Sequence, residues 1–361
     1  MAIPGLALSA LVASAGLLTS DWIGKSLFGF EKSPVSGIMM AILIGLLLAN
    51  VVRLPAWLKT GIRFSSSSVL RLGIVLLGIR LSLGEILKVG IVGIPLIVLC
   101  LTGAVVVTRW IGAQLRLPGR LGILIAIGTS ICGVSAIAAA GPAIRARDEE
   151  IAYAVANITV FGIAATFLYP YLAHTLFAGA ETPVGLFLGT AIHDTAQVAG
   201  SGLIYAQVFG AERVLDIATV TKLVRNLFMI VIIPLMVYLY QQEQVKEEDR
   251  HTVKLWELFP VFILGFVLLA AFRTIGDATL PSGQAWGLWQ AEGWVQLTDS
   301  VRSAAELTLA IAMAGVGLGT NLQQLRRLGL KPFAVGLSAA VTVGLLSLSG
   351  ITLLMRTGLI R

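Results

Sequence analysis

Two basic side chains inside an apolar stretch have the clearest potential for chemistry in this sequence. Lys222 and Arg225 lie within the apolar run from 214 to 240. Their spacing places them on one face of a helix, and two cations on one face of a membrane helix need an anionic partner. We expect that partner to be Asp194, a bound anion, or both. The alternative is a pair that extends its charged ends toward the membrane surface.

Asp194 and the preceding His193 are ionisable residues within another apolar segment. Such a residue costs roughly 2.5–3.5 kcal/mol on membrane-insertion scales and normally faces an interior cavity. Asp194 could bind a coupling proton or cation, and a histidine titrates near neutral pH. The alternative is that Asp194 caps a half-helix or pairs with a nearby base.

Two similar stretches interrupt apolar segments with small and polar residues. They are GTSICGVSAIAA at 128–139 and GTAIHDTAQVAG at 189–200. In lipid, the backbone groups that such residues free must be buried in protein or line a cavity. We therefore expect broken helices near the membrane midplane, whose half-helix N-termini present N–H groups to an anion. Close helix packing through small residues is the alternative.

The predicted site combines these stretches with polar residues that end other apolar runs. Thr320 and Asn321 follow the glycine-rich GVGLG at 315–319 and could equally cap or bridge helices. Arg80, Asn157 and Glu306 are weaker candidates. The predicted substrate-binding residues are Thr129, Ser130, Cys132, Gly133, Ser135, Thr190, Lys222, Arg225, Asn226, Thr320 and Asn321, and the predicted coupling residues are His193 and Asp194.

The elements that position these residues follow from hydropathy. Of 361 residues, 57% are hydrophobic and 12% charged, about half the charge of a soluble domain. Runs of about 18 apolar residues span the hydrocarbon core. The sequence thus predicts an all-α polytopic membrane protein of ten or eleven transmembrane segments, in a single domain over 1–361. The candidate segments are 4–22, 36–53, 67–84, 90–112, 121–143, 150–175, 183–206, 213–240, 254–273, 301–320 and 333–356.

Composition and motifs disfavour several functions. The formal net charge is +7, but the basic residues cluster between apolar runs, which is the positive-inside pattern and does not indicate nucleic acid. Cys100 and Cys132 lie inside apolar segments, so we expect no disulfide framework, metal or cofactor. There is no nucleotide-binding signature and no nucleophile with a base at useful spacing, so an enzyme or a primary pump is not expected. A membrane sensor or enzyme is the rival from another class.

Orientation follows from the basic connections. With eleven crossings, the clusters near Arg53, Arg116, Lys246 and Arg326 share one side. Calling that side cytoplasmic places the N-terminus inside and the C-terminus outside. The tryptophan-rich connection at 277–300 would then lie at the outer interface. Arg145 and Arg147 fall on the side opposite to the other clusters.

Internal similarity predicts inverted repeats. GIRLSLGEILKVG at 78–90 resembles GVGLGTNLQQLRRLG at 315–329, which suggests halves near 36–177 and 182–356 after one extra N-terminal helix. With eleven crossings, the two members of this pair are inverted relative to each other, but the two Gly-Thr stretches would be parallel. Either one segment is re-entrant or one similarity is accidental.

Five motifs together resemble one family. They are LRLGIVLLGIRLSLGEIL at 70–87, GTSICGVSAIAAAGPAI at 128–144, GTAIHDTAQVAGSG at 189–202, KLVRN at 222–226 and AMAGVGLGTNLQQLRRLGLKP at 312–332. Their order along nearly the whole chain is similar to that of the YeiH-like bacterial inner-membrane proteins, which are described as sulfate exporters. The resemblance implies the superfamily of cation/proton antiporters and anion transporters, with inverted repeats and a core that moves against a scaffold.

The leading prediction is therefore a secondary transporter of the bacterial inner membrane that exports a small inorganic or sulfur-containing anion. Lys222 and Arg225 would attract the anion, and Asp194 with His193 would couple a proton or Na⁺. A cation/proton antiporter, with Asp194 as carrier and Lys222 as its alternating partner, is the second transporter hypothesis. The sequence leaves the oligomeric state open, a homodimer included.

Overall fold

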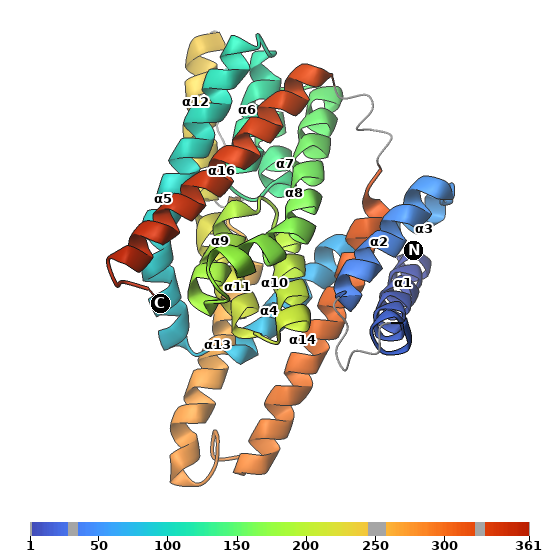
Figure 1. The fold of residues 1–361 in the computed structure, drawn as a ribbon, viewed down its shortest axis with the longest axis vertical. Coiled ribbons are helices and arrows are strands. Elements are labelled where there is room, and N and C mark those ends of the chain that lie inside the picture. The colour runs from blue at the N-terminus through green and yellow to red at the C-terminus, as the bar shows by residue number, and fades with distance from the viewer. Residues whose placement is uncertain (1, 28–34, 245–257, 322–328, 361) are drawn as a thin grey trace. The chain divides into compact units, whose positions relative to one another are not determined.

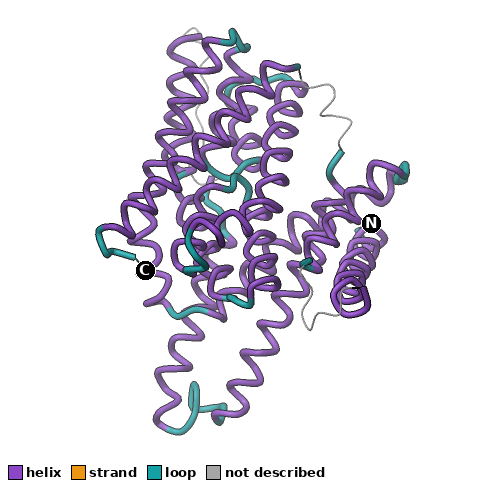
Figure 2. Tube along the Cα trace, viewed as in Figure 1, coloured by secondary structure: helices purple, strands orange, loops and turns teal. Residues whose placement is uncertain are grey.

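The chain folds into helices in the computed structural model, which describes residues 2–27, 35–244, 258–321 and 329–360 (Figures 1 and 2). This confirms the predicted all-α class. The α-helices are α1 Ile3–Asp21, α2 Gly37–Val51, α3 Ala56–Phe64, α4 Leu70–Leu77, α5 Leu83–Gln114, α6 Gly119–Ser130, α7 Val134–Ala143, α8 Asp148–Leu176, α9 Glu181–Ala191, α10 Thr195–Phe209, α11 Arg213–Leu227, α12 Met229–Gln244, α13 Phe262–Thr279, α14 Ala291–Gly319 and α16 Leu330–Arg356.

The helices are those of a polytopic membrane protein. Among the described residues, 7 helices are long and apolar enough to cross a membrane, and an eighth crossing is present if α11 and α12, bent by 42°, are one span. The helices α2, α6 and α7 are apolar but shorter. Most predicted segments coincide with one helix or with two helices separated by a short break. The segments at 67–84 and 301–320 start well inside longer helical stretches, which begin at Ala56 and Ala291, and the segment at 254–273 starts outside the described residues, with α13 beginning at Phe262.

Two compact units share these helices. The first comprises 1–89, 202–216 and 261–321, and the second comprises 90–201, 217–260 and 322–361. The chain passes between them within α5, α10 and α11, and again at 260/261 and 321/322. Each unit therefore draws segments from both of the sequence halves near 36–177 and 182–356.

In the first unit, helices approach closely through glycines. A Cβ atom added to Gly45 of α2 would lie 2.8 Å from the carbonyl oxygen of Ala314 in α14. Small residues allow such backbone contact, which is how membrane helices gain packing energy without a hydrophobic driving force. The tryptophan-rich connection adds a small core of its own. Trp294 is buried, and its Nε1 donates to Asp277 over 2.8 Å.

In the second unit, α6 and α7 form a re-entrant hairpin. Arg120 at the start of α6 donates from Nε to the Tyr240 hydroxyl, and Gln241 donates from Nε2 to the Ala143 carbonyl at the end of α7, each over 3.2 Å. Both ends of the pair thus lie beside adjacent residues of α12 (Figure 1). The chain reverses at 131–133, where Gly133 has φ +66°, a conformation that favours glycine.

The helices α9 and α10 form a second re-entrant hairpin. In α9, the ring of Phe187 lies 5.1 Å from Tyr169 and 5.8 Å from Phe177. In α10, Gln197 Nε2 donates to the Thr159 carbonyl over 3.4 Å. Phe187 thus contacts the C-terminal part of α8 and Gln197 its middle, and the chain reverses between the two legs at 192–194.

The two hairpins enter the second unit from opposite ends, because α6 and α7 pack on the N-terminal part of α8. Gly141 of α7, for example, lies against Ile151. The two Gly-Thr stretches are therefore inverted relative to each other. Eleven straight crossings would have made them parallel. The expected position of Arg145 and Arg147 is corrected as well. The first hairpin returns to the end at which it began, so both arginines lie at the same end as Arg120.

Candidate functional site

The bends of the two hairpins meet at Lys222 and Arg225 of α11, which are both fully buried. Lys222 Nζ donates to the carbonyls of Ile131 over 2.8 Å and Ile192 over 3.1 Å, and through a short contact to that of His193. One cation thus holds backbone from both bends.

Arg225 makes a similar set of hydrogen bonds one helical turn away. Its Nε donates to Ser130 O over 2.8 Å and its Nη2 to Thr129 O over 2.6 Å, both at the end of α6. Its Nη1 donates to Thr190 O over 2.6 Å and to Ile192 O over 3.2 Å, at the end of α9. The planar guanidinium therefore bridges the two half-helices.

The local reason is that a helix leaves its last four carbonyls without partners in the helix. Lipid cannot satisfy such groups, so a broken membrane helix must find donors elsewhere. The C-terminal end of a helix also carries a partial negative charge. Two cations on one face of α11 supply both the donors and the opposite charge.

Asp194 lies at the start of the returning half-helices. Its Oδ1 accepts from the backbone N–H of Ala196 over 2.9 Å, and so caps α10. The backbone of Val134, at the start of α7, also hydrogen-bonds to Asp194. This is the capping alternative, realised at two helix N-termini at once. In the described part of the chain, no ion pair joins Lys222 to Asp194; the coupling role of Asp194 stays a prediction.

We call the place where the two hairpin bends meet at α11 the crossing. The formal and partial charges at the crossing sum to a positive value, which favours an anion. Lys222 and Arg225 carry two positive charges, and the ends of α6 and α9 contribute about −0.5 each. The single negative charge of Asp194 faces about +0.5 from each of the starts of α7 and α10. With His193 counted as neutral, the sum is about one positive charge.

Four buried polar atoms near the crossing have no hydrogen-bond partner among the described residues. They are Thr129 Oγ1, His193 Nδ1, Thr221 Oγ1 and Asn226 Oδ1. Buried polar groups normally have partners, including water. These atoms are therefore candidates for contacts with a ligand or with water.

The two sides of the crossing differ in accessibility. The carbonyl side is closed, since Thr129, Ser130 and Thr190 are fully buried. On the N–H side, Ser135 in the first turn of α7 is exposed, and Asp194 is partly exposed. A ligand that reaches this centre in the described state therefore meets the helix N-termini first.

Two residues at the crossing are not among the predicted site residues. The Thr195 hydroxyl, next to Asp194, accepts from Asn226 Nδ2 over 3.0 Å. Thr221 precedes Lys222 and lies against Gly189. Adjacency to a predicted charged residue was the available signal in both cases.

Other predicted residues have different surroundings. The Thr190 hydroxyl lies 2.7 Å from that of Ser347, so only its carbonyl faces Arg225. Cys132 lies in the first bend with its Sγ 3.2 Å from Met229 Sδ. Thr320 and Asn321 belong to the first unit, where the Thr320 carbonyl accepts from Asn50 Nδ2 over 2.9 Å.

Arg80, a weaker candidate, is the centre of an ion cluster in the first unit. It donates to Asp216 over 2.6 Å, to Glu306 over 3.2 Å and to Glu212 over 3.3 Å, and Arg302 also pairs with Glu212. Arg80 lines a cavity of about 400 Å³ with Glu212, Glu306 and mainly apolar residues. Since its guanidinium is saturated by carboxylates, the cluster has no evident place for an anion.

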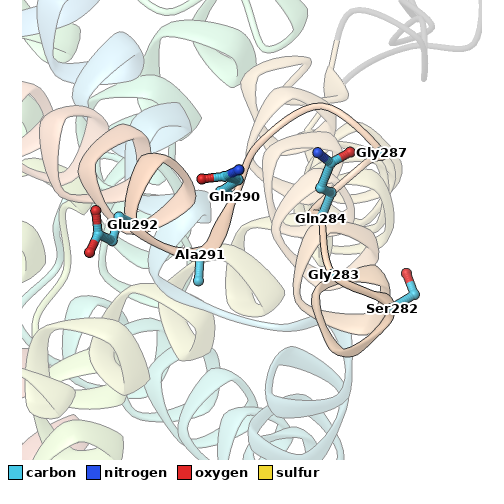
Figure 3. A pocket seen from close by; sticks show the side chains of 7 residues that line it. All are labelled: Ser282, Gly283, Gln284, Gly287, Gln290, Ala291 and Glu292. Carbon is cyan, nitrogen blue, oxygen red and sulfur yellow. The ribbon is translucent and has the colours of Figure 1, made fainter.

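A larger hollow than the one beside Arg80 lies at the connection between α13 and α14. It has about 670 Å³ and is open to one side. Figure 3 shows its lining, in which Glu292 is the one charged residue. Size alone does not identify the site here. The crossing of the hairpins, with its buried charges, is the better candidate.

Comparisons with known proteins identify the family of the chain. The family model "Conserved hypothetical protein 698" matches residues 4–336. A UPF0324 membrane protein of Fusobacterium nucleatum is 31% identical over 332 residues, which is 91% of this chain and 92% of the relative. The chain belongs to the UPF0324 membrane protein family.

Other relatives have the same family name. One from Streptococcus pyogenes is 33% identical over 350 residues, 96% of each chain. One from Pseudomonas aeruginosa is 33% identical over 359 residues, 96% of this chain and 92% of the relative. Together with the apolar helices, these names make the chain a bacterial multi-pass membrane protein. The names give no substrate, so sulfate export remains part of the proposal below.

Proposed function

We propose that this protein is a secondary active transporter that exports a small anion. The observation that carries the proposal is the crossing of two re-entrant hairpins around the buried cations Lys222 and Arg225. Broken helices that meet inside a membrane protein are the usual place of substrate and coupling-ion sites in secondary transporters. The excess of about one positive charge favours an anion there.

The anion binds on the N–H side of the crossing. All three N–H groups of Lys222 donate to carbonyls, and Arg225 uses four of its five. The two cations therefore attract the anion through their field more than by direct contact. The contacts come from backbone N–H groups at the starts of α7 and α10, with Ser135 and Thr195 as neighbouring hydroxyls.

Asp194 gives this site a route to coupling. Its carboxylate occupies N–H groups that an anion would also use. Protonation removes its negative charge and raises the excess at the crossing to about two positive charges. The charge of a divalent oxyanion such as sulfate then matches this excess in size and is opposite in sign, so the oxyanion and the proton bind together.

The test is flux in proteoliposomes that contain the purified full-length protein. Labelled sulfate, sulfite, thiosulfate and small sulfonates are compared under imposed proton and sodium gradients. We expect saturable movement of at least one anion that responds to the proton gradient. Lys88→Ala, which changes an exposed lysine, is the matched control for loss of charge. Exchange of Na⁺ or K⁺ for protons without anion flux would indicate the cation antiporter, and absence of any flux would reject transport of these substrates.

A further inference from the structure

The ammonium group of Lys222 occupies a cage of backbone oxygens. The oxygens are the carbonyls of Ile131, Ile192 and His193, and they come from both hairpin bends. A lysine ammonium has three N–H groups and no acceptor, so all of its donors are engaged. Carbonyls at unwound half-helix ends are the groups with which broken-helix transporters hold Na⁺. The three oxygens thus form a cation site that the protein's own lysine side chain occupies.

Arg225 extends the same arrangement. The Ile192 carbonyl accepts from both Lys222 and Arg225, and the carbonyls of Thr129, Ser130 and Thr190 accept from Arg225 alone. Every carbonyl that the two bends turn toward α11 in these contacts already accepts from a buried basic side chain. A sodium ion bound among them would be repelled by two fixed cations in a buried environment, where screening is weak.

We propose that Lys222 is a built-in substitute for a coupling sodium ion, so that the crossing binds no sodium and the coupling ion is the proton. The first part concerns binding alone. The second part rests on the proposed transport function. Asp194, the one carboxylate that the described residues bring to the crossing, is the group that takes the proton, because it is partly accessible and is not neutralised by Lys222 in an ion pair.

Thermal unfolding of the purified full-length protein tests the first part. NaCl, KCl, methylammonium chloride and choline chloride are compared at equal ionic strength. The wild-type Tm is expected to be the same in sodium and choline within about 1 °C. Lys222→Ala empties the cage and should lower the Tm in choline by roughly 5–15 °C. Sodium, potassium or methylammonium should restore at least about a third of that loss, since each supplies a cation to the vacated oxygens.

Two further variants make the result specific. Lys222→Gln fills the cage with a neutral amide and should be destabilised without recovery in any of the salts. Lys88→Ala should show neither effect, because Lys88 is exposed. A saturable rise of the wild-type Tm with sodium would overturn the proposal, as would a Lys222→Ala protein that no small cation stabilises. If that variant cannot be purified, the wild-type comparison decides.

Flux separates this inference from the proposed function. Anion flux that requires a sodium gradient overturns the inference and leaves the transporter in place. The wild-type Tm could be insensitive to sodium and the Tm of Lys222→Ala restored by cations while no anion moves. That result would support the built-in cation and reject the proposed substrates. Flux driven by a proton gradient, unchanged when choline replaces sodium, supports both.

Discussion

Replacing Arg225 by lysine keeps the positive charge at the crossing but removes the planar fork. In the structure, Arg225 makes four hydrogen bonds, two to the end of α6 and two to the end of α9. A lysine at 225 offers three N–H groups from one nitrogen, whereas the guanidinium makes its four bonds from three nitrogens spread over a plane. We count two of the four bonds as lost, each charge-assisted and worth roughly 1.5–3 kcal/mol. The expected destabilisation is therefore about 3–6 kcal/mol.

The assay is thermal unfolding in detergent together with anion flux in proteoliposomes. A loss of about 3 kcal/mol corresponds to a Tm lower by roughly 6–12 °C, and we expect flux to fall at least about tenfold because the two bends are no longer held together. Arg147→Lys is the matched control, since Arg147 is exposed and pairs with Glu150 over 3.5 Å at a spacing of three. Such pairs contribute about 0.3–0.5 kcal/mol, so its Tm should hardly change. A Tm and flux like those of the wild type in Arg225→Lys would refute the bridging role.

Three other predictions concern topology, coupling and the first bend. Single cysteines at Ala146 and Gly179, in a background without the two native cysteines, should react with a membrane-impermeant thiol reagent from the cytoplasmic and the periplasmic side respectively; eleven straight crossings would give the reverse labelling. Asp194→Asn should leave sulfate binding intact by equilibrium measurement but remove the dependence of flux on the proton gradient; an unchanged pH profile contradicts its coupling role. Gly133→Ala should lower the Tm by several degrees, because φ is +66° and a Cβ would lie 3.1 Å from an Asp194 oxygen; Gly122→Ala, which meets nothing within 4 Å, is its control, and equal Tm values for the two would show that the bend tolerates a side chain.

The re-entrant hairpins illustrate what local sequence does not contain. A broken crossing and a hairpin that turns back have the same composition, namely an apolar run with Gly, Thr and Ser in its middle. The difference lies in long-range contacts, such as those of Arg120 and Ala143 with neighbouring residues of α12. The charges of Arg145 and Arg147 were the available hint, because they disagreed with the side that straight crossings required.

Sequence by itself determined the membrane class, the apolar segments, the two breaks and the set Asp194, Lys222 and Arg225. Each follows from a local cost, either of exposing backbone to lipid or of burying charge. Only the tertiary structure decided what those charges touch. The expected partner of Lys222 and Arg225 was an acid or an anion, whereas the structure supplies backbone carbonyls. Every residue has the same backbone carbonyl. Residue types therefore do not show which carbonyls two distant helix ends bring together around a buried cation.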